Sequence, residues 1–199
     1  MRILLVGASG TIGRAVAAEL GQRHEIVSAG RTSGDLQLDI TDSSSIRSAY
    51  EGAGPLDAVV SAAGHVKFAP FEEMEAADYA IGLQDKLMGQ VNLVLIGRHY
   101  VADGGSFTLT TGVLDRDPIR QGTSASMVNG AINAFVRSAA IEMQRGQRIN
   151  VVSPGVIEEA MEAYGPFFRG FEPVPAARAA LAYAKSAEGA QTGQVYLVE

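Results

Sequence analysis

The chain contains no cysteine, no tryptophan and only three histidines. Without cysteine there can be no disulfide, no thiolate nucleophile and no iron–sulfur cluster, and we expect a reducing compartment. The histidines, His24, His65 and His99, are far apart and lack the spacing of metal ligands, so no metal site is predicted.

Long apolar runs and an excess of positive charge are also missing. The opening apolar run, residues 3–6, is shorter than a signal-peptide core of about 7–15 residues and far shorter than a membrane span of about 18. With 22 acidic residues against 16 basic ones, the chain has a formal net charge of −6 and offers no basic face to nucleic acid. We therefore expect a cytoplasmic protein without a nucleic-acid or membrane partner.

The length of 199 residues fits one domain, since single domains usually hold about 50–250 residues. Short, almost wholly apolar runs alternate with longer stretches of helical period, which is typical of parallel strands covered by helices on both faces. This alternation predicts a doubly wound α/β sheet with right-handed crossovers. The expected strands span residues 2–6, 24–28, 36–38, 57–61, 106–110, 148–152 and 194–198. The expected helices span about residues 11–21, 43–52, 72–102, 122–145 and 175–185.

Three glycines, Gly7, Gly10 and Gly13, stand between the first expected strand and the first expected helix. Glycines at this spacing allow a tight turn, a close approach of the backbone to a pyrophosphate, and close packing of the helix on the strand. The free N–H groups of the helix N-terminus would then bind the anion. The turn predicts a dinucleotide site, and the alternative is a tight strand-to-helix turn without a ligand.

Arg31 follows the second expected strand, 21 residues after Gly10, where dinucleotide-binding folds recognise the adenine ribose. An acidic residue there would select NAD, whereas a guanidinium followed by the hydroxyls of Thr32 and Ser33 suits the 2′-phosphate of NADP. We therefore expect NADP(H) as the cofactor, with NAD(H) less favoured. The alternative is a solvated arginine on a loop.

These features resemble the short-chain dehydrogenase/reductase family, and the likeness covers nearly the whole chain. Asp39-Ile40 matches the adenine contact of that family, residues 61–64 (SAAG) match its Asn-Asn-Ala-Gly motif without the asparagines, and residues 148–155 (RINVVSPG) match its sixth strand and Pro-Gly turn. The resemblance implies a Rossmann fold, with a mostly parallel seven-stranded sheet in a three-layer α/β/α arrangement. The cofactor-binding residues that it implies are Gly7, Ser9, Gly10, Thr11, Ile12, Gly13, Arg31, Thr32, Asp39, Ile40, Ala62, Ala63, Gly64, Thr110, Pro154, Gly155 and Val156.

The catalytic groups of the family are absent from their aligned positions. The family uses a Tyr-x-x-x-Lys pair on one helix, a serine after the fifth strand and an asparagine on the preceding helix. In this chain Ala125 stands at the tyrosine position and Asn129 at the lysine position. Gly112 stands at the serine position, next to Thr111, and Lys86 takes the place of the asparagine. No shift of the alignment restores the pair, because the helix contains neither tyrosine nor lysine.

Lys86 is the leading candidate for the missing proton donor. A lysine on the opposite wall of the cleft would keep a cation near the nicotinamide ribose and the developing oxyanion, with Asn129 as an uncharged ribose ligand. We expect the Lys86 ammonium to point toward Asn129 and Thr111, within hydrogen-bond reach or through one water. The alternative is a solvated lysine on a helix surface.

Other residues are weaker candidates for the site. His65 follows the turn at residues 62–64, at the sheet edge where ligands bind, and an imidazole suits acid–base chemistry near neutral pH; the alternative is an exposed, idle side chain. Tyr164 precedes an irregular aromatic segment, residues 165–175 (GPFFRGFEPVP), which is either a lid over the site or a loop with an apolar underside. Asp115, Arg116 and Asp117 either bind a polar substrate or face solvent.

The expected helix over residues 122–145 carries two usable faces. One is an apolar stripe at helical spacing, which would cover the sheet. The other would meet a second copy of the chain, as in the dimers and tetramers of the family, so we expect a homodimer or homotetramer; the alternative is packing under a helix of the same chain. The first face comprises Val128, Ile132, Phe135, Val136, Ala139 and Met143, and the second comprises Met127, Ala131, Ala134 and Ser138.

Two functions fit these observations. The first is an NADP(H)-dependent oxidoreductase that acts on a small carbonyl compound or alcohol through a non-standard proton donor, since the cofactor carries the hydride and the protein supplies placement. The second is an NADP(H)-binding sensor or scaffold that has lost catalysis. The fold cannot decide between them. Consumption of NADPH with a carbonyl substrate would separate the two.

Overall fold

The short apolar runs form one parallel sheet in the computed structural model, which describes residues 1–199. The strand order is β3-β2-β1-β4-β5-β6-β7. The predicted doubly wound Rossmann fold is therefore confirmed. The strands are β1 (Arg2–Val6), β2 (Glu25–Gly30), β3 (Leu36–Gln37), β4 (Leu56–Ser61), β5 (Val101–Thr110), β6 (Arg148–Pro154) and β7 (Val195–Val198).

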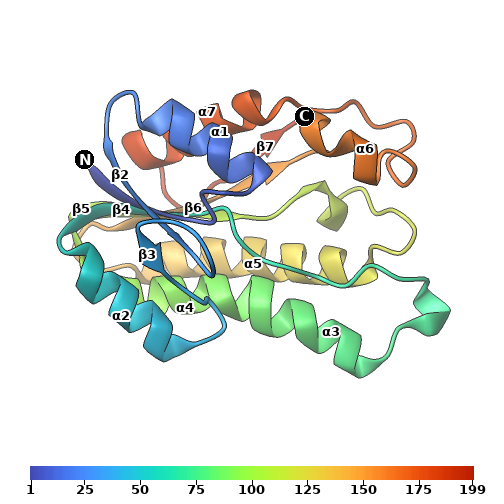
Figure 1. Ribbon diagram of the computed structural model, residues 1–199, viewed down its shortest axis with the longest axis horizontal. Helices are drawn as coiled ribbons and strands as arrows, with labels where there is room; N and C mark the ends of the chain where they lie inside the picture. The colour runs from blue at the N-terminus through green and yellow to red at the C-terminus, as the bar shows by residue number, and fades with distance from the viewer.

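Helices cover both faces of the sheet and give the three layers that Figure 1 shows. Side chains alternate across β1, so that Leu4 enters the core under one helical layer and Leu5 enters the core under the other. Tyr50 and Phe107 fill the first core, and Tyr183 fills the second. One layer holds α1 (Thr11–Leu20) and α7 (Ala176–Glu188), and the other holds α2 (Ser43–Ala53), α4 (Met88–Gly97) and α5 (Thr123–Glu142).

The single helix expected over residues 72–102 is wrong, because that stretch is broken in several places. Its last helix stops at Gly97, which lies against the buried ring of Tyr50; a Cβ on Gly97 would come within 2.2 Å of the Tyr50 hydroxyl oxygen. Val101 and Ala102 then belong to β5. The parts are a 3₁₀ turn at Phe71–Glu73, α3 (Ala76–Gly82), a single π-helical turn at Leu83–Leu87, here called the π-turn, and α4.

The connection between β6 and α7 contains a short helix that the sequence did not predict, α6 (Met161–Tyr164). In the aromatic segment that follows, Phe168 is buried in a small apolar cluster and Val174 forms a β-bridge with Ile157. The segment therefore has an apolar underside, which was one of its two predicted interpretations. No helix in the chain combines the length and the apolar character that a membrane span requires.

The carboxyl ends of the central strands place the predicted cofactor residues along one edge of the sheet. β1 lies between β2 and β4, so the chain returns past β1 after completing β3. The loops after β1 and β4 therefore diverge at this point, and in open α/β sheets such a switch point is where ligands bind. The loop with Gly7, the loop with Ala63 and the end of β6 at Pro154 all lie at this edge.

Candidate functional site

The turn between β1 and α1 leaves the N-terminus of the helix open. Gly10 is the N-cap residue of α1, and no side chain caps this helix, so its first N–H groups are available to an anion. A Cβ on Gly13 would lie 2.0 Å from the carbonyl oxygen of Gly7, so only glycine allows α1 to pack this closely on the turn. A Cβ on Gly10 would lie 3.4 Å from the same oxygen, which is an ordinary contact. The space at Gly10 is therefore not required by the fold.

Two adjoining cavities lie along the carboxyl edge of the sheet. The first, here called the Arg31 cavity, has a volume of about 300 Å³ and is bounded by the turn after β1, the end of β2 and the π-turn. Asp85 of the π-turn also lines it, although no motif in the sequence singles out that residue. The predicted cofactor residues in its wall are Gly7, Ser9, Arg31, Thr32, Ile40, Ala63 and Gly64.

Arg31 is held by carboxylates rather than being solvated on its own. Its Nε lies 3.2 Å from Asp39 Oδ2, and its Nη2 lies 3.3 Å from Asp85 Oδ2. Asp39 also accepts hydrogen bonds from the backbone N–H and the hydroxyl of Thr41, at 2.9 and 2.7 Å. These Thr41 hydrogen bonds, assisted by the charge of Arg31, hold the pKa of Asp39 below its usual range. The arginine that we predict to bind a 2′-phosphate thus already has two anionic partners.

The second cavity, here called the Lys86 cavity, has a volume of about 300 Å³ and shares Gly64 and His65 with the first. It brings together the four predicted catalytic residues, Lys86, Asn129, Thr111 and His65, with Ile12, Pro154 and Gly155 of the predicted cofactor set. No aspartate or glutamate lines it. Its aromatic side chains are Phe68, Tyr164 and Phe168, and the rings of Phe68 and Tyr164 are 6.3 Å apart between centroids.

Lys86 is the only lysine or arginine in this cavity. Its aliphatic stem lies over Gly64, where a Cβ would come within 2.7 Å of Lys86 Cγ. Burial disfavours the charged form and lowers the pKa of Lys86 to about 8, and no carboxylate lines the cavity to oppose this effect. The ammonium forms no direct hydrogen bond to Asn129 or Thr111, one of the two arrangements that the sequence led us to expect, and the acceptor Asn129 Oδ1 has no donor at all.

Asn129 and Thr111 differ in how far their polar groups are satisfied. Asn129 is 2% exposed, its Nδ2 donates to the Gly112 carbonyl at 3.3 Å, and its Oδ1 is buried without a partner. The Thr111 hydroxyl donates to Asn133 Oδ1 at 3.1 Å, and Asn133 in turn donates to Asp115 at 2.7 Å. The cavity therefore offers one unpaired acceptor, Asn129 Oδ1, and the lone pairs of the Thr111 oxygen.

Several predicted residues lie outside both cavities. Gly10, Thr11 and Gly13 form the start of α1, Ala62 follows β4, and Asp39 pairs with Arg31. The Thr110 hydroxyl contacts the Ser61 carbonyl and Tyr183 in the core, and Val156 is buried in an apolar cluster.

The weaker candidates for substrate binding and acid–base chemistry also differ in position. Arg116 donates to Ser153 and pairs with Glu199, and Asp117 is exposed. His65, by contrast, lines both cavities with an exposed side chain, and its backbone N–H donates to Asp85 Oδ1 at 2.8 Å.

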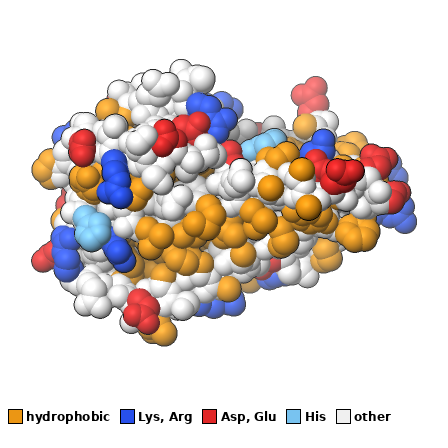
Figure 2. All heavy atoms as spheres, turned by 90° about the horizontal axis from the view of Figure 1, so that it is seen from below, with side chains coloured by type: hydrophobic (Ala, Val, Ile, Leu, Met, Phe, Trp, Pro, Cys, Tyr) orange, Lys and Arg blue, Asp and Glu red, His pale blue; other side chains and the backbone are white.

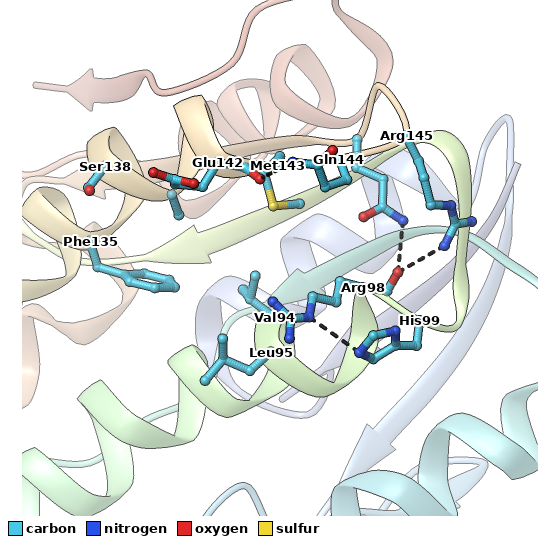
Figure 3. A pocket seen from close by; sticks show the side chains of 12 residues that line it. Val94, Leu95, Arg98, His99, Phe135, Ser138, Glu142, Met143, Gln144 and Arg145 are labelled. Atoms are coloured by element: carbon cyan, nitrogen blue, oxygen red, sulfur yellow. Dashed lines mark hydrogen bonds between the residues drawn. The ribbon is translucent and has the colours of Figure 1, made fainter.

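A third hollow, of about 450 Å³, lies between the ends of α4 and α5 (Figure 3). Val94, Leu95, Phe135 and Met143 form its apolar wall, and the charged side chains at its rim include Arg98, Glu142 and Arg145. Residues 98–99 follow α4 and residues 143–147 follow α5, so this hollow lies near the amino ends of β5 and β6. It is therefore separate from the cleft that holds the predicted cofactor residues.

The fold, the open helix N-terminus and the paired cavities are the features expected of a dinucleotide-binding α/β protein. A family model described as enoyl-(acyl carrier protein) reductase matches residues 7–199. The chain belongs to the short-chain dehydrogenase/reductase family, a family of oxidoreductases.

Solved structures resemble this chain over nearly its whole length. The protein lin1944 from Listeria innocua is 54% identical, with full coverage of both chains and a TM-score of 0.99. A small-chain dehydrogenase in complex with NADPH is 25% identical, with 100% of this chain and 96% of that chain covered and a TM-score of 0.88. A short-chain type dehydrogenase/reductase from Mycobacterium ulcerans shares the fold at 19% identity, with 99% and 87% coverage and a TM-score of 0.86. No curated protein matches the sequence.

Proposed function

We propose that this protein is an NADP(H)-dependent oxidoreductase that interconverts a small carbonyl compound and its alcohol, with Lys86 as the proton donor. The observation that carries this proposal is that the Lys86 cavity holds a cation without an anionic partner and a buried acceptor, Asn129 Oδ1, without a donor. Buried polar groups are normally hydrogen-bonded within the protein. Groups left open at the carboxyl edge of such a sheet are therefore best explained by partners on bound ligands.

The residues present fit a dinucleotide along the whole cleft. The uncapped N-terminus of α1 suits a pyrophosphate, and Arg31 at the end of β2 suits a 2′-phosphate. At the other end, Asn129 Oδ1 can accept a hydrogen bond from a ribose hydroxyl. The neighbour of 25% identity in complex with NADPH supports NADP(H) as the cofactor. When bound, the nicotinamide ring supplies or accepts the hydride.

Lys86 can perform the acid step that a tyrosine performs in the family. With a pKa of about 8, it is mostly protonated at neutral pH and is a better acid than an ordinary lysine. During reduction its ammonium would stabilise the negative charge that develops on the carbonyl oxygen and then transfer a proton to that oxygen. The amine left behind is neutral, which the apolar walls favour. Water can restore the proton after the alcohol leaves.

Thr111 acts as a positioning residue in this proposal. Its hydroxyl hydrogen is directed to Asn133, so it does not donate to a substrate in this arrangement. Its oxygen can accept a hydrogen bond from the Lys86 ammonium and so orient that group. Asp115 fixes Asn133, which makes it part of the support for the site and not a substrate ligand.

The cavity favours a small, uncharged and partly apolar substrate. Pro154, Gly155 and Ile12, which belong to the predicted cofactor wall, share the volume of about 300 Å³ with the substrate. The remaining wall includes Phe68 and Tyr164 and no carboxylate. An aldehyde or ketone with a single ring or short chain fits these limits.

The test is a fluorescence titration with NADPH and NADH, followed by NADPH oxidation with a panel of small aldehydes and ketones. We expect tighter binding of NADPH and oxidation with at least one uncharged carbonyl compound. Binding without turnover across the panel would favour the sensor or scaffold function. Failure to bind either dinucleotide would overturn both.

We also propose that a second copy of the chain covers the exposed face of α4 and α5. Met88, Leu95 and Met127 are exposed large hydrophobic residues on these helices. Figure 2 shows a band of hydrophobic side chains along this side of the molecule, with a group of acidic side chains at one end and basic side chains and a histidine at the other. A two-fold axis through the band would bring opposite charges together.

The mass of the protein in solution tests this proposal. Light scattering at micromolar concentration should give twice or four times the chain mass, and a monomer would overturn this proposal.

A further inference from the structure

We propose that Asp85 sets the balance between NADPH and NADH by holding the Arg31 guanidinium across the Arg31 cavity. The inference rests on the proposed function, because it concerns the cofactor of the same site. Asp85 lies 54 residues from Arg31 in the sequence and reaches it from the opposite wall of the cavity. It therefore acts on the part of the cleft where a 2′-phosphate is expected.

The two carboxylates at Arg31 occupy different positions. Asp39 lies eight residues after Arg31, on the same side of the cavity, and is held by Thr41. Asp85 belongs to the π-turn, so its contact with Arg31 is the one that spans the cavity. A ligand that enters between the end of β2 and the π-turn must displace this contact. The Asp39 contact need not break for the same ligand to enter.

Asp85 is held in the cavity wall by a second hydrogen bond, whereas Arg31 is the more exposed member of the pair. Asp85 Oδ1 accepts a hydrogen bond from the His65 backbone N–H at 2.8 Å, which leaves Oδ2 for Arg31 at 3.3 Å. The Asp85 side chain is 15% exposed, whereas the Arg31 side chain is 60% exposed. Opening the contact therefore requires movement of the guanidinium, while the carboxylate stays in the wall.

This arrangement affects the two cofactors differently. Both must open the Arg31–Asp85 contact, but only NADPH gives Arg31 a new anionic partner. The 2′-phosphate then lies near the remaining carboxylates, and Asp85 repels it. Asp85→Asn removes the negative charge and keeps an oxygen that can accept from the His65 N–H. Both cofactors should bind more tightly to this variant, and NADPH should gain more than NADH.

The position of Asp85 on the π-turn lets cofactor binding be measured separately from proton donation. Asp85 and Lys86 are consecutive, yet Asp85 lines the Arg31 cavity and Lys86 lines the other cavity. Single π-turns of this kind often occur at functional sites. A change at Asp85 can therefore be read from cofactor affinity without involving the proposed proton donor.

Calorimetry on the full-length protein should compare NADPH, NADH, 2′,5′-ADP and 5′-AMP. For Asp85→Asn we expect NADPH and 2′,5′-ADP to bind about fivefold more tightly, and NADH and 5′-AMP about twofold, as suits an exposed ion pair. Asp103→Asn is the matched control, because Asp103 is exposed and pairs with Arg145 at the amino end of β5. It should leave all four affinities unchanged. The melting temperatures show whether each variant is folded.

A double-mutant cycle tests whether Asp85 affects cofactor affinity through Arg31. In an Arg31→Ala background there is no crossing contact to open, so Asp85→Asn should no longer improve NADH binding. An unchanged NADPH-to-NADH ratio in Asp85→Asn, or weaker NADPH binding, would overturn this inference alone. Failure of the wild-type protein to bind any of the four ligands would overturn the proposed function as well.

Discussion

The cations in the two cavities of the cleft differ in whether they have anionic partners. In the Arg31 cavity the cation already contacts two carboxylates, Asp39 and Asp85. In the Lys86 cavity the cation contacts none, and the nearby Asn129 Oδ1 has no donor. A ligand in the first cavity must replace existing partners, whereas a ligand in the second satisfies groups that are unpaired. The first is therefore suited to select a cofactor, and the second is suited to react with a substrate.

The largest expected effect comes from a change at Gly10, which lies outside both cavities but in the turn that we propose to bind the cofactor. Gly10→Val should reduce the affinity for NADPH and NADH on the order of 100-fold or more, because the side chain would occupy the space of the pyrophosphate. The fold has room for it, since a Cβ at this position would contact only the Gly7 carbonyl oxygen, at 3.4 Å. Circular dichroism and the melting temperature should stay close to those of the wild type.

The matched control is Gly13→Val, where a Cβ would lie 2.0 Å from the Gly7 oxygen. We expect that variant to lose stability itself. If Gly10→Val instead keeps its dinucleotide affinity, the interpretation of the turn as a pyrophosphate site is wrong.

The second prediction separates the cavities by their chemistry. Lys86→Met should lower kcat for carbonyl reduction by about 100-fold, the usual scale for loss of a general acid, and leave the Kd for NADPH nearly unchanged. In the wild type, kcat should fall as the pH rises above about 8, because Lys86 then loses its proton. The variant should lack this descending limb.

Lys67→Met is the control for Lys86→Met, since Lys67 is exposed and outside the cavity wall. It should retain wild-type turnover and the same pH profile. Unchanged turnover in Lys86→Met, with the same profile as the wild type, would remove Lys86 from the mechanism and favour the non-catalytic function.

Local patterns explain why most of the fold, and the gathering of several proposed cofactor residues at one edge of the sheet, could be predicted from the sequence. Strands such as β1 and β4 are mostly apolar runs followed by glycine or small residues, and the spacing of Gly7, Gly10 and Gly13 is itself a local signal. The break in the helix over residues 72–102 could not be predicted this way. Leu83 and Leu87 keep helical spacing across the π-turn, and no proline marks it.

The features of the site that the sequence could not predict depend on contacts between residues far apart in the chain. The role of Asp85 depends on Arg31, 54 residues away, and the lack of a partner at Asn129 Oδ1 depends on how α5 packs against the end of β5. The alignment with the family placed Lys86 and Asn129 near one another. It gave no information on whether their polar groups would be satisfied.

The third prediction concerns stability. In the folded chain the pKa of Lys86 is lowered to about 8, so between about pH 8 and 10.5 the unfolded chain holds a proton that the folded chain does not. The contribution of Lys86 to the unfolding free energy therefore rises with pH across this window. Below pH 8 the folded protein bears the full penalty of a desolvated ammonium, and Lys86→Met should stabilise it on the order of 1–3 kcal/mol.

Urea unfolding at neutral pH and at high pH measures this effect. The gain from Lys86→Met should be largest at neutral pH and should shrink as the pH approaches 10.5, while Lys67→Met shows no such trend. A destabilised Lys86→Met variant would mean that the ammonium has a favourable partner in the folded protein. That result would contradict the contrast between the two cavities.

The smallest expected effect belongs to Arg31→Ala, and it is the converse of Lys86→Met. Arg31 lines only the first cavity, so its loss should weaken NADPH binding by about tenfold, as expected for a charge-assisted contact to a phosphate. NADH binding should not weaken, because the Arg31–Asp85 contact that NADH must open is lost as well. Once the variant is saturated with NADPH, its kcat should equal that of the wild type, because Lys86 keeps its surroundings. Equal affinity of the wild type for NADH and NADPH would refute the cofactor assignment. A lower kcat at saturation would show that the π-turn, which carries both Asp85 and Lys86, transmits changes from one cavity to the other.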